Sequence, residues 1–208
     1  MTGDVFVTGT DTGVGKTVLS ALLVAALNRR YWKPVQTGAC EGTDRAAVMK
    51  FADVGAGRIH PEAFVFDPPV SPHLAAEQQG VRIDIKAIRR PEDPAPIVIE
   101  GAGGVLVPIN DQELMIDLIC HLQAPVIVAA RTTLGTINHT LLTVAAIRNA
   151  GVKLTGVVMV GRENLDNRRA IVRYGSVPVV GTIPWLDSID RSSLCRAFDQ
   201  YFDKTSFA

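Results

Sequence analysis

The chain has 208 residues, of which 47% are hydrophobic and 20% are charged, and its 21 Lys and Arg residues balance its 21 Asp and Glu residues. This length and composition are those of one globular domain over residues 1–208, and they exclude an intrinsically disordered chain. A balanced charge gives no global field that would recruit nucleic acid or an anionic membrane. We therefore expect neither as a partner, and we expect any affinity for phosphate to be local.

The cysteines and the apolar segments indicate a cytoplasmic protein. Cys40, Cys120 and Cys195 are odd in number, far apart and without C-x-x-C spacing, which favours reduced thiols over a disulfide framework or a zinc site. The longest apolar stretch, residues 18–27, is too short to span a bilayer and follows a glycine-rich loop rather than a basic leader. We therefore expect no targeting segment and a location in the cytoplasm.

Strand and helix patterns alternate along the chain. The strands are β-branched runs without polar alternation, which is typical of a parallel sheet that is covered on both faces. They are predicted at residues 5–8, 31–36, 97–100, 126–130, 156–160 and 177–182, and the helices at residues 17–29, 44–52, 73–90, 113–122, 137–150, 166–174 and 191–202. This order predicts a doubly wound, mostly parallel α/β sheet with helices on both faces, in which ligands bind beyond the carboxyl ends of the strands.

The first strand leads into a loop with the features of a phosphate-binding site. Residues 9–17 read GTDTGVGKT, and the usual pattern G-x-x-x-x-G-K-[ST] places backbone N–H groups around phosphates, the lysine on the β/γ oxygens and the hydroxyl on Mg²⁺. Gly15, Lys16 and Thr17 fit this pattern, whereas its first glycine falls one place early. Gly13 and Gly15 still let the backbone approach a phosphate at the start of a helix. We therefore predict a site of the P-loop type rather than a plain turn between a strand and a helix.

Two acidic residues are candidates for holding Mg²⁺. Glu100 ends an apolar run and precedes a glycine-rich segment, and Mg²⁺ takes one or two protein carboxylates. The alternative is that Glu100 is a strand-end acid that faces solvent. Asp44 stands at the predicted start of a helix, and its position alone favours a role as helix cap.

Lys33 lies inside an otherwise apolar run. The following Pro34 rules out a helix at this point, and a buried ammonium group needs an anionic partner. We expect that partner to be a phosphate held by Lys16 or a carboxylate of the substrate. The alternative is a lysine whose stem lies along the strand and whose charge reaches solvent.

Six segments, in this order along residues 5–186, resemble the dethiobiotin synthetase family, the ATP-dependent carboxylases of biotin biosynthesis. They are GTDTGVGKT (9–17), KPVQTG (33–38), VSPH (70–73), EGAGG (100–104), LGTINH (134–139) and GTIPWL (181–186). The resemblance implies a P-loop NTPase fold and a ligase that converts 7,8-diaminononanoate, CO₂ and Mg-ATP to dethiobiotin, ADP and phosphate. In the family mechanism one amine forms a carbamate, the carbamate attacks the γ-phosphate, and the second amine displaces phosphate from the mixed anhydride.

The resemblance also implies roles for residues on the nucleotide side. Lys16 would hold the β/γ-phosphates, and Lys33 would bind the carbamate and the charge that develops on the transferred phosphoryl group, so these two residues are the catalytic candidates. Thr17, Asp44 and Glu100 would surround Mg²⁺. The ATP-binding residues would be Gly13, Val14, Gly15, Lys16, Thr17, Val18, Asp44, Glu100, Gly101, Ala102, Gly103, Pro184, Trp185 and Leu186.

On the substrate side the resemblance implies a homodimer with shared active sites. Thr12 and Thr37 match positions that contact the diamine or the carbamate. The distal carboxylate of the substrate would be bound by the neighbouring subunit at a helix start, where N–H groups suit a carboxylate. That helix start is Gly135, Thr136, Ile137 and Asn138. Without the resemblance, these four residues indicate only an ordinary helix start.

The resemblance leaves the nucleobase open. Without it, Trp185 would be interpreted as a packed loop aromatic. Some members read adenine with an asparagine after the fifth strand, where this chain has Gly161. The sequence therefore does not decide between ATP and CTP or another triphosphate.

Three other classes of protein share parts of the pattern. Switch ATPases of the partitioning or septum-positioning type have the same fold but carry a lysine early in the loop, where this chain has Asp11. Amidotransferase-type synthetases add a glutaminase domain, for which 208 residues leave no room. A binding module without turnover is the third alternative.

Overall fold

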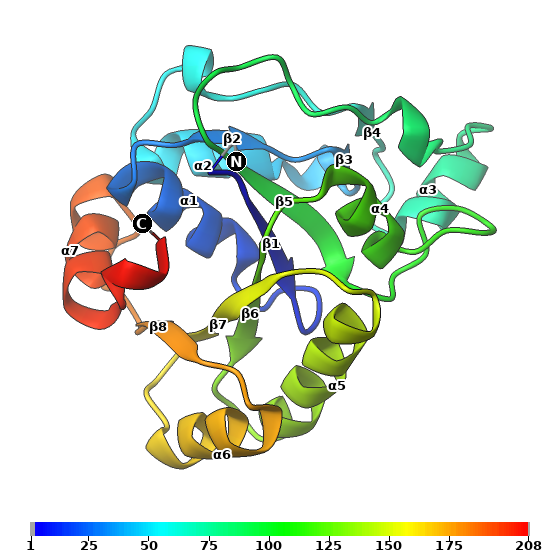
Figure 1. Cartoon of the computed structure of the whole chain (residues 1–208). Coiled ribbons are helices and arrows are strands. Elements are labelled where there is room, and N and C mark those ends of the chain that lie inside the picture. The colour runs from blue at the N-terminus through cyan, green and yellow to red at the C-terminus, as the bar shows by residue number, and fades with distance from the viewer. Residues whose placement is uncertain (1–2, 208) are drawn as a thin grey trace.

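The computed structural model describes residues 3–207 and arranges them around a six-stranded parallel sheet (Figure 1). The strand order is β2-β5-β1-β6-β7-β8, and every neighbouring pair is parallel. The strands are β1 (Val5–Gly9), β2 (Arg30–Trp32), β5 (Ile97–Gly104), β6 (Val126–Arg131), β7 (Leu154–Val160) and β8 (Val179–Ile183). The predicted doubly wound parallel α/β sheet is confirmed.

Helices cover both faces of this sheet, as Figure 1 shows. One face carries α1 (Lys16–Ala26), α2 (Asp44–Ala52) and α7 (Arg191–Tyr201), and the other carries α4 (Met115–Leu122), α5 (Thr136–Asn149) and α6 (Leu165–Gly175). Successive side chains of a strand point to opposite faces, so Val5 and Val7 of β1 join the core under α1 while Phe6 joins the core under α4. Both faces are buried, which explains why the strands lack polar alternation.

The predicted strand at residues 31–36 is wrong, because the chain breaks in its middle. β2 ends at Trp32, and β3 (Val35–Gln36) pairs instead with β4 (Phe64–Val65) in a separate two-stranded sheet. Pro34 has no N–H group to continue the ladder, and its carbonyl accepts hydrogen bonds from the N–H groups of Ala63 and Phe64. This break lets the chain leave the main sheet directly after Lys33.

The predicted helix at residues 73–90 is also wrong over most of its length. Helix α3 (Pro72–Gln78) makes only two turns, and a 3₁₀ turn (Ile85–Ala87) follows. Gly80 has a φ of 66°, and the N–H groups of Gly80 and Val81 bond back to carbonyls of the last helical turn. A glycine in the left-handed conformation with such bonds ends a helix.

The structure also bears on the cysteines and on the length of the helices. Cys40, Cys120 and Cys195 are free, as the sequence predicts. No helix within residues 3–207 has both the length and the apolar character that crossing a membrane requires.

Gly181 of β8 lies under the ring of Phe202, and this contact gives a test of the core. A Cβ atom at Gly181 would stand 2.5, 2.6 and 2.7 Å from three ring atoms of Phe202, whose ring packs against Phe198 and Phe207. Because this aromatic cluster leaves the ring little room to move, we expect Gly181→Ala to lower the free energy of unfolding by about 1–3 kcal/mol in urea denaturation. Gly57→Ala is the control, since a Cβ atom there meets nothing within 4 Å, and it should change stability by less than about 0.5 kcal/mol. Equal stabilities of the two variants would contradict the prediction.

Candidate active site

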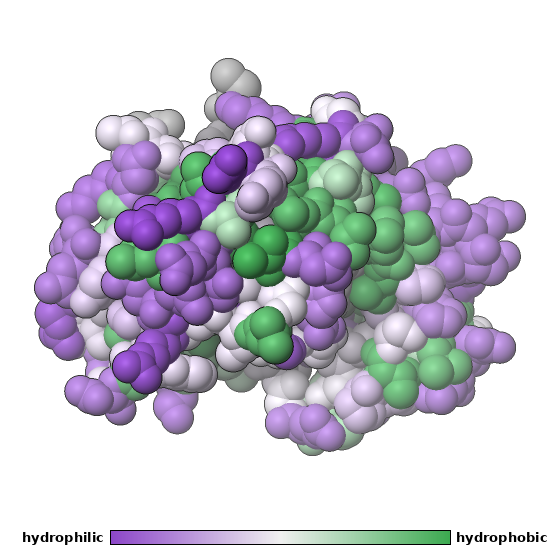
Figure 2. Space-filling model, turned by 90° about the horizontal axis from the view of Figure 1, so that it is seen from below, coloured by the Kyte–Doolittle hydropathy of each residue, from purple (hydrophilic) through white to green (hydrophobic). Residues whose placement is uncertain are grey.

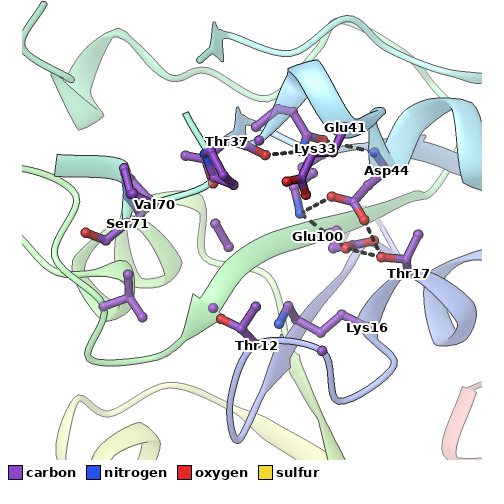
Figure 3. A pocket seen from close by; sticks show the side chains of 18 of the residues that line it. Thr12, Lys16, Thr17, Lys33, Thr37, Glu41, Asp44, Val70, Ser71 and Glu100 are labelled. Carbon is purple, nitrogen blue, oxygen red and sulfur yellow. Dashed lines mark hydrogen bonds and ion pairs between the residues drawn. The ribbon is translucent and has the colours of Figure 1, made fainter. Parts of the chain in front are cut away.

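The loop after β1, the residue after β2 and the second half of β5 surround a cavity of about 710 Å³ (Figure 3). β5 runs through Gly104 rather than ending at Glu100 as predicted, so the glycine-rich segment is itself part of the sheet. The predicted site residues that line the cavity are Thr12, Gly13, Gly15, Lys16, Thr17, Val18, Lys33, Thr37, Asp44, Glu100, Ala102 and Gly103. The fold thus brings together most of the residues that were selected from separate segments of the sequence.

The loop between β1 and α1 has the conformation that a phosphate-binding loop needs. Gly13 and Gly15 have φ values of 69° and 96°, in the left-handed region that favours glycine. A Cβ atom on Gly15 would stand 2.8 Å from a methyl group of Val160, so no larger residue fits there. Lys16 begins α1, and its Nζ donates a hydrogen bond of 2.9 Å to the carbonyl of Asp11. The N-terminus of α1 therefore borders the cavity, as a site for phosphate requires.

Lys33 makes the central ion pairs of the site. Its Nζ lies 2.9 Å from Oδ2 of Asp44 and 3.3 Å from Oε1 of Glu100, and it donates to the carbonyl of Gly101 at 3.3 Å. The residue is only 4% exposed, so its charge does not reach solvent along the strand. Two carboxylates of the chain itself are its anionic partners, and the expected phosphate or substrate carboxylate stays a prediction. Lys33 meets Glu100 because Trp32 of β2 pairs with Ile99 of β5.

The hydroxyl of Thr17 contacts the carboxylates of both Asp44 and Glu100. Its hydroxyl lies within hydrogen-bonding distance of Oδ1 of Asp44 and is 3.1 Å from Oε1 of Glu100, as the dashed lines in Figure 3 show. Asp44 is in the first turn of α2, but Thr43 is the residue whose side chain caps that helix, by accepting from the N–H group of Ala46. The role as helix cap that position alone favoured for Asp44 is therefore wrong, although its carboxylate does lie in the first turn, where it complements the helix dipole, and it also borders the cavity.

The sequence analysis missed two residues that support this cluster. The hydroxyl of Tyr31 donates to Oε2 of Glu100 at 3.1 Å, and Oε1 of Gln36 accepts from the N–H group of Asp44 at 3.0 Å. Tyr31 lies two residues before Lys33, a spacing that places side chains on the same side of an extended chain. That spacing is the signal that could have indicated Tyr31. Gln36 could have been noted as a polar residue at the end of an apolar run.

Burial and neighbouring charges together determine the pKa values of Lys33, Asp44 and Tyr31. Burial alone would lower the pKa of Lys33, but the carboxylates of Glu100 and Asp44 outweigh it and raise that pKa above its ordinary value. Burial would raise the pKa of Asp44, but Lys33 and the hydrogen bond from Thr17 hold it below its usual range. Burial and the Glu100 carboxylate raise the pKa of Tyr31 well above its ordinary value. Lys33 and Asp44 therefore form a charged pair at neutral pH, and Tyr31 stays a neutral donor.

Lys16 has the opposite environment from Lys33. Burial, and then the charge of Lys33, lower the pKa of Lys16 to about 8, although Glu100, Asp44 and Asp11 partly oppose this. Its ammonium group is thus buried, and the carboxylates near it do not offset the cost of that burial. An anion that binds beside it would offset that cost.

The oxygen atoms of Thr17, Asp44 and Glu100 fit a magnesium ion. Mg²⁺ prefers oxygen ligands, takes one or two carboxylates and keeps several waters, and a P-loop hydroxyl with a nearby acid is its usual protein environment beside a triphosphate. In the described part of the chain, no group of three or more His, Cys, Asp and Glu side chains is arranged to hold a metal ion. A metal at this place would therefore also need oxygens from phosphate and water.

Other predicted residues lie outside the cavity. Val14 is buried in the core, and Gly101 takes part through its carbonyl. Pro184, Trp185 and Leu186 line a separate groove of about 260 Å³ against α7. The segment from Gly135 to Asn138 caps and begins α5 and does not border the cavity. The roles of these residues stay predictions.

Comparison with known proteins decides the family. A family model described as an AAA domain matches residues 3–193. The ATP-dependent dethiobiotin synthetase BioD of Rhodopseudomonas palustris (strain HaA2) is 48% identical over 207 residues, which cover 100% of this chain and 97% of that protein. The protein of the same name from Bradyrhizobium sp. (strain BTAi1 / ATCC BAA-1182) is 45% identical, with 98% of each chain covered.

The chain belongs to the ATP-dependent dethiobiotin synthetase family. This confirms the resemblance and the expected class of enzyme, an ATP-dependent ligase of biotin biosynthesis. Among solved structures, the ParA family ATPase from Chlorobium tepidum TLS superposes with a TM-score of 0.54 at 12% identity, with 94% of this chain and 90% of that chain covered. The MinC:MinD cell division protein complex of Aquifex aeolicus gives a TM-score of 0.50 at 11% identity, with 93% and 85% covered. Likeness at such low identity shows the P-loop fold alone.

The burial of the Lys16 ammonium group predicts that the free energy of unfolding depends on pH. Because its pKa is about 8 in the folded protein and 10.5 ordinarily, the unfolded chain holds a proton between these values that the folded chain has lost. The cost of burying the charge is complete below pH 8 and disappears as the pH rises toward 10.5. We expect Lys16→Met to raise the free energy of unfolding of the nucleotide-free protein by about 1–3 kcal/mol at pH 7 and to lose this advantage above pH 10.

Urea denaturation at pH 7, 8.5 and 10 measures this effect. Lys50→Met is the matched control, because Lys50 is exposed, and it should change stability by less than about 0.5 kcal/mol at each pH. A Lys16→Met variant that is less stable than the parent at pH 7, or a difference that does not vary with pH, would refute the interpretation of Lys16.

Proposed function

We propose that this chain carboxylates 7,8-diaminononanoate and closes its urea ring, with CO₂ and Mg-ATP as the other substrates and ADP and phosphate as the other products. The observation that carries the proposal is a single cavity that contains Lys16, Lys33 and the oxygens of Thr17, Asp44 and Glu100. Membership of the dethiobiotin synthetase family supports the same reaction. We further propose that residues 1–208 form one catalytic domain that works in the cytoplasm.

On the nucleotide side, Lys16 and the N-terminus of α1 are proposed to hold the β- and γ-phosphates. This assignment is supported by the lowered pKa of Lys16, because a phosphate would offset the cost of burying its ammonium group. Thr17, Asp44 and Glu100 would hold Mg²⁺, whose charge would offset negative charge on the phosphates. The hydroxyl of Thr17 is within hydrogen-bonding distance of both carboxylates, so the three side chains would need little rearrangement to hold the ion.

On the reacting side, Lys33 is proposed to bind the carbamate and the phosphoryl group in transfer. In the first step an amine nitrogen forms a bond to CO₂ and loses a proton, and the resulting carbamate oxygen then forms a bond to the γ-phosphorus while the bond to ADP breaks. In the last step the second amine bonds to the carbonyl carbon and inorganic phosphate leaves. None of these steps demands a strong protein base, so positioning and a fixed positive charge are the main contributions of the chain.

The diamine is proposed to lie between Thr12 and Thr37, which face the cavity from the loop after β1 and from the segment after β3. Figure 3 shows both residues on the side of Lys33 that is away from Thr17. A carbamate that reached from this side to the γ-phosphate would pass the ammonium group of Lys33.

The distal carboxylate of the substrate is proposed to be bound by a second copy of the chain, at its Gly135, Thr136, Ile137 and Asn138. Three apolar side chains support a homodimer at this face, because Leu106, Leu134 and Leu142 are exposed. Leu106 and Leu142 border a groove of about 350 Å³ between the loop after β5 and α5. Figure 2 shows apolar side chains gathered on the lower face of the molecule, where α5 and α6 lie in Figure 1.

The nucleobase is proposed to rest on Pro184, Trp185 and Leu186 without a side chain that reads its edge. Gly161 follows β7 with a φ of 126°, and a Cβ atom there would stand 2.7 Å from Oγ1 of Thr132. Gly161 itself has no side chain to offer, and a larger residue at this position would require the side chain of Thr132 to move. This geometry favours weak selectivity for the base.

Release of inorganic phosphate tests the proposed reaction. With Mg-ATP present, we expect release only when 7,8-diaminononanoate and bicarbonate are both supplied, and a fall of at least roughly tenfold when either is omitted, because the phosphoryl group has no acceptor without a carbamate. The same assay with CTP in place of ATP measures the selectivity for the base. Release from ATP alone, or release that responds to DNA instead of the diamine, would indicate a switch ATPase and refute the proposal.

Replacement of Lys33 tests its part in the reaction. We expect Lys33→Met to lower kcat by roughly 10²–10³-fold, the usual cost of removing one preorganised donor, and to change the affinity for Mg-ATP by less than about threefold. Thermal melting with Mg-ATP present checks that the variant is folded, because Asp44 and Glu100 lose a cation in the empty site. Lys86→Met, at an exposed position, is the control. Unchanged turnover in Lys33→Met would remove Lys33 from the mechanism.

A further inference from the structure

Arg131 reaches from the end of one strand to the loop of its neighbour. It is the last residue of β6, which pairs with β1 so that Ala129 lies beside Gly9. Arg131 lies two residues after Ala129, so it is next to the loop that follows β1. The sequence analysis gave it no role, and it does not border the main cavity.

The guanidinium group of Arg131 binds two consecutive residues of that loop and lies beside the third. Its Nη2 donates a hydrogen bond of 2.7 Å to the carbonyl of Thr12 and lies 3.6 Å from Oδ2 of Asp11. A Cβ atom built on Gly13 would have the same Nη2 as its nearest neighbour, at 3.9 Å. The planar head group thus lies along the tip of the loop, and a guanidinium is suited to such multiple contacts.

The conformation of the loop tip, residues 11–13, depends on such contacts more than the conformation of the residues that follow it. Asp11, Thr12 and Gly13 are exposed, whereas Val14 is buried and the residues from Lys16 onward are fixed in α1. On one side Asp11 is held by Lys16, which donates to its carbonyl. On the other side the tip is held by Arg131, so the conformation of Thr12 depends on both cations.

We infer that Arg131 is a positioning residue for the diamine, which acts by fixing the backbone of Thr12. The inference rests on the proposed function, in which Thr12 contacts the diamine or carbamate. Apart from Gly13, the residues expected to hold the phosphates are Gly15, Lys16 and Thr17, whereas the hydrogen bond and ion pair of Arg131 go to Thr12 and Asp11. Loss of Arg131 should therefore impair use of the diamine and leave binding of the nucleotide almost intact.

Steady-state kinetics and nucleotide binding separate these two effects. We expect Arg131→Met to raise the KM for 7,8-diaminononanoate roughly tenfold, the effect of losing one hydrogen bond to a charged group, while the Kd for Mg-ATP changes less than about twofold. Arg131→Lys should recover part of the loss, because it keeps the charge but not the fork of donors. Arg169→Met is the matched control, since Arg169 is exposed and pairs only with Asp166 among the described residues.

Hydrogen exchange provides a readout that does not depend on turnover. In the nucleotide-free protein, backbone amides in the peptide of residues 9–17 should exchange faster in Arg131→Met than in the parent, with no change in the peptides of α5 and α6. Equal exchange, or an equal loss of diamine and ATP affinity, would overturn the inference. If Arg131→Met does not fold, Arg131→Lys decides the question by the same two measurements.

Failure of this inference is distinguishable from failure of the proposed function. A parent protein that releases no phosphate with all substrates present would refute the function, and faster exchange in the variant would then show that Arg131 holds the loop for another ligand, which also overturns its role toward the diamine. An active parent with unchanged kinetics in Arg131→Met would overturn the inference alone.

Discussion

The site depends on the ammonium group of Lys33, which lies between the carboxylates of Asp44 and Glu100. Two acids this close and this little exposed would repel each other without a cation, and removal of one partner from such a buried cluster is strongly destabilising. The same cluster limits how Lys33 can act. Its three N–H groups already have three acceptors, so it can donate to an incoming anion only after one of those acceptors has found another cation. The groups that balance charge within this cluster are therefore the same groups that are proposed to act in the reaction.

The two lysines of the cavity have pKa values that their surroundings shift in opposite directions. Lys33 is stabilised as a cation by its acids, whereas Lys16 is destabilised as a cation by burial and by Lys33. The free energy that burial costs at Lys16 would be regained if an anion bound there as proposed, which is the behaviour expected of a group that serves binding rather than stability. The neutral hydroxyl of Tyr31 completes the arrangement by satisfying the second oxygen of Glu100.

The sequence predicted what depends on local pattern and failed where partners come from distant segments. The loop of residues 9–17 and the strand that carries Glu100 could be recognised because the pattern within a short segment determines them, although the end of that strand, at Gly104, could not. The partners of Lys33 could not, because they follow from the adjacency of β2 and β5 in the sheet, which no local pattern specifies. Pro34 and Gly80 were visible as interruptions, yet the apolar pattern around them continued, and the predicted strand and helix were extended through both.

Arg131 links the two ends of the proposed substrate site. Its side chain holds Thr12 in the phosphate loop, and its carbonyl accepts a hydrogen bond of 2.5 Å from the hydroxyl of Thr136 at the start of α5. One chain thus ties its own phosphate loop to the helix start that is proposed to bind the substrate of the neighbouring subunit. In a homodimer the position of each phosphate loop would then be connected, through a single residue, to the site that its subunit offers to its partner. Because the two ends of one diamine would be held by different subunits, a shift of the phosphate loop in one subunit would be passed through Arg131 to the carboxylate of the diamine bound in the other subunit.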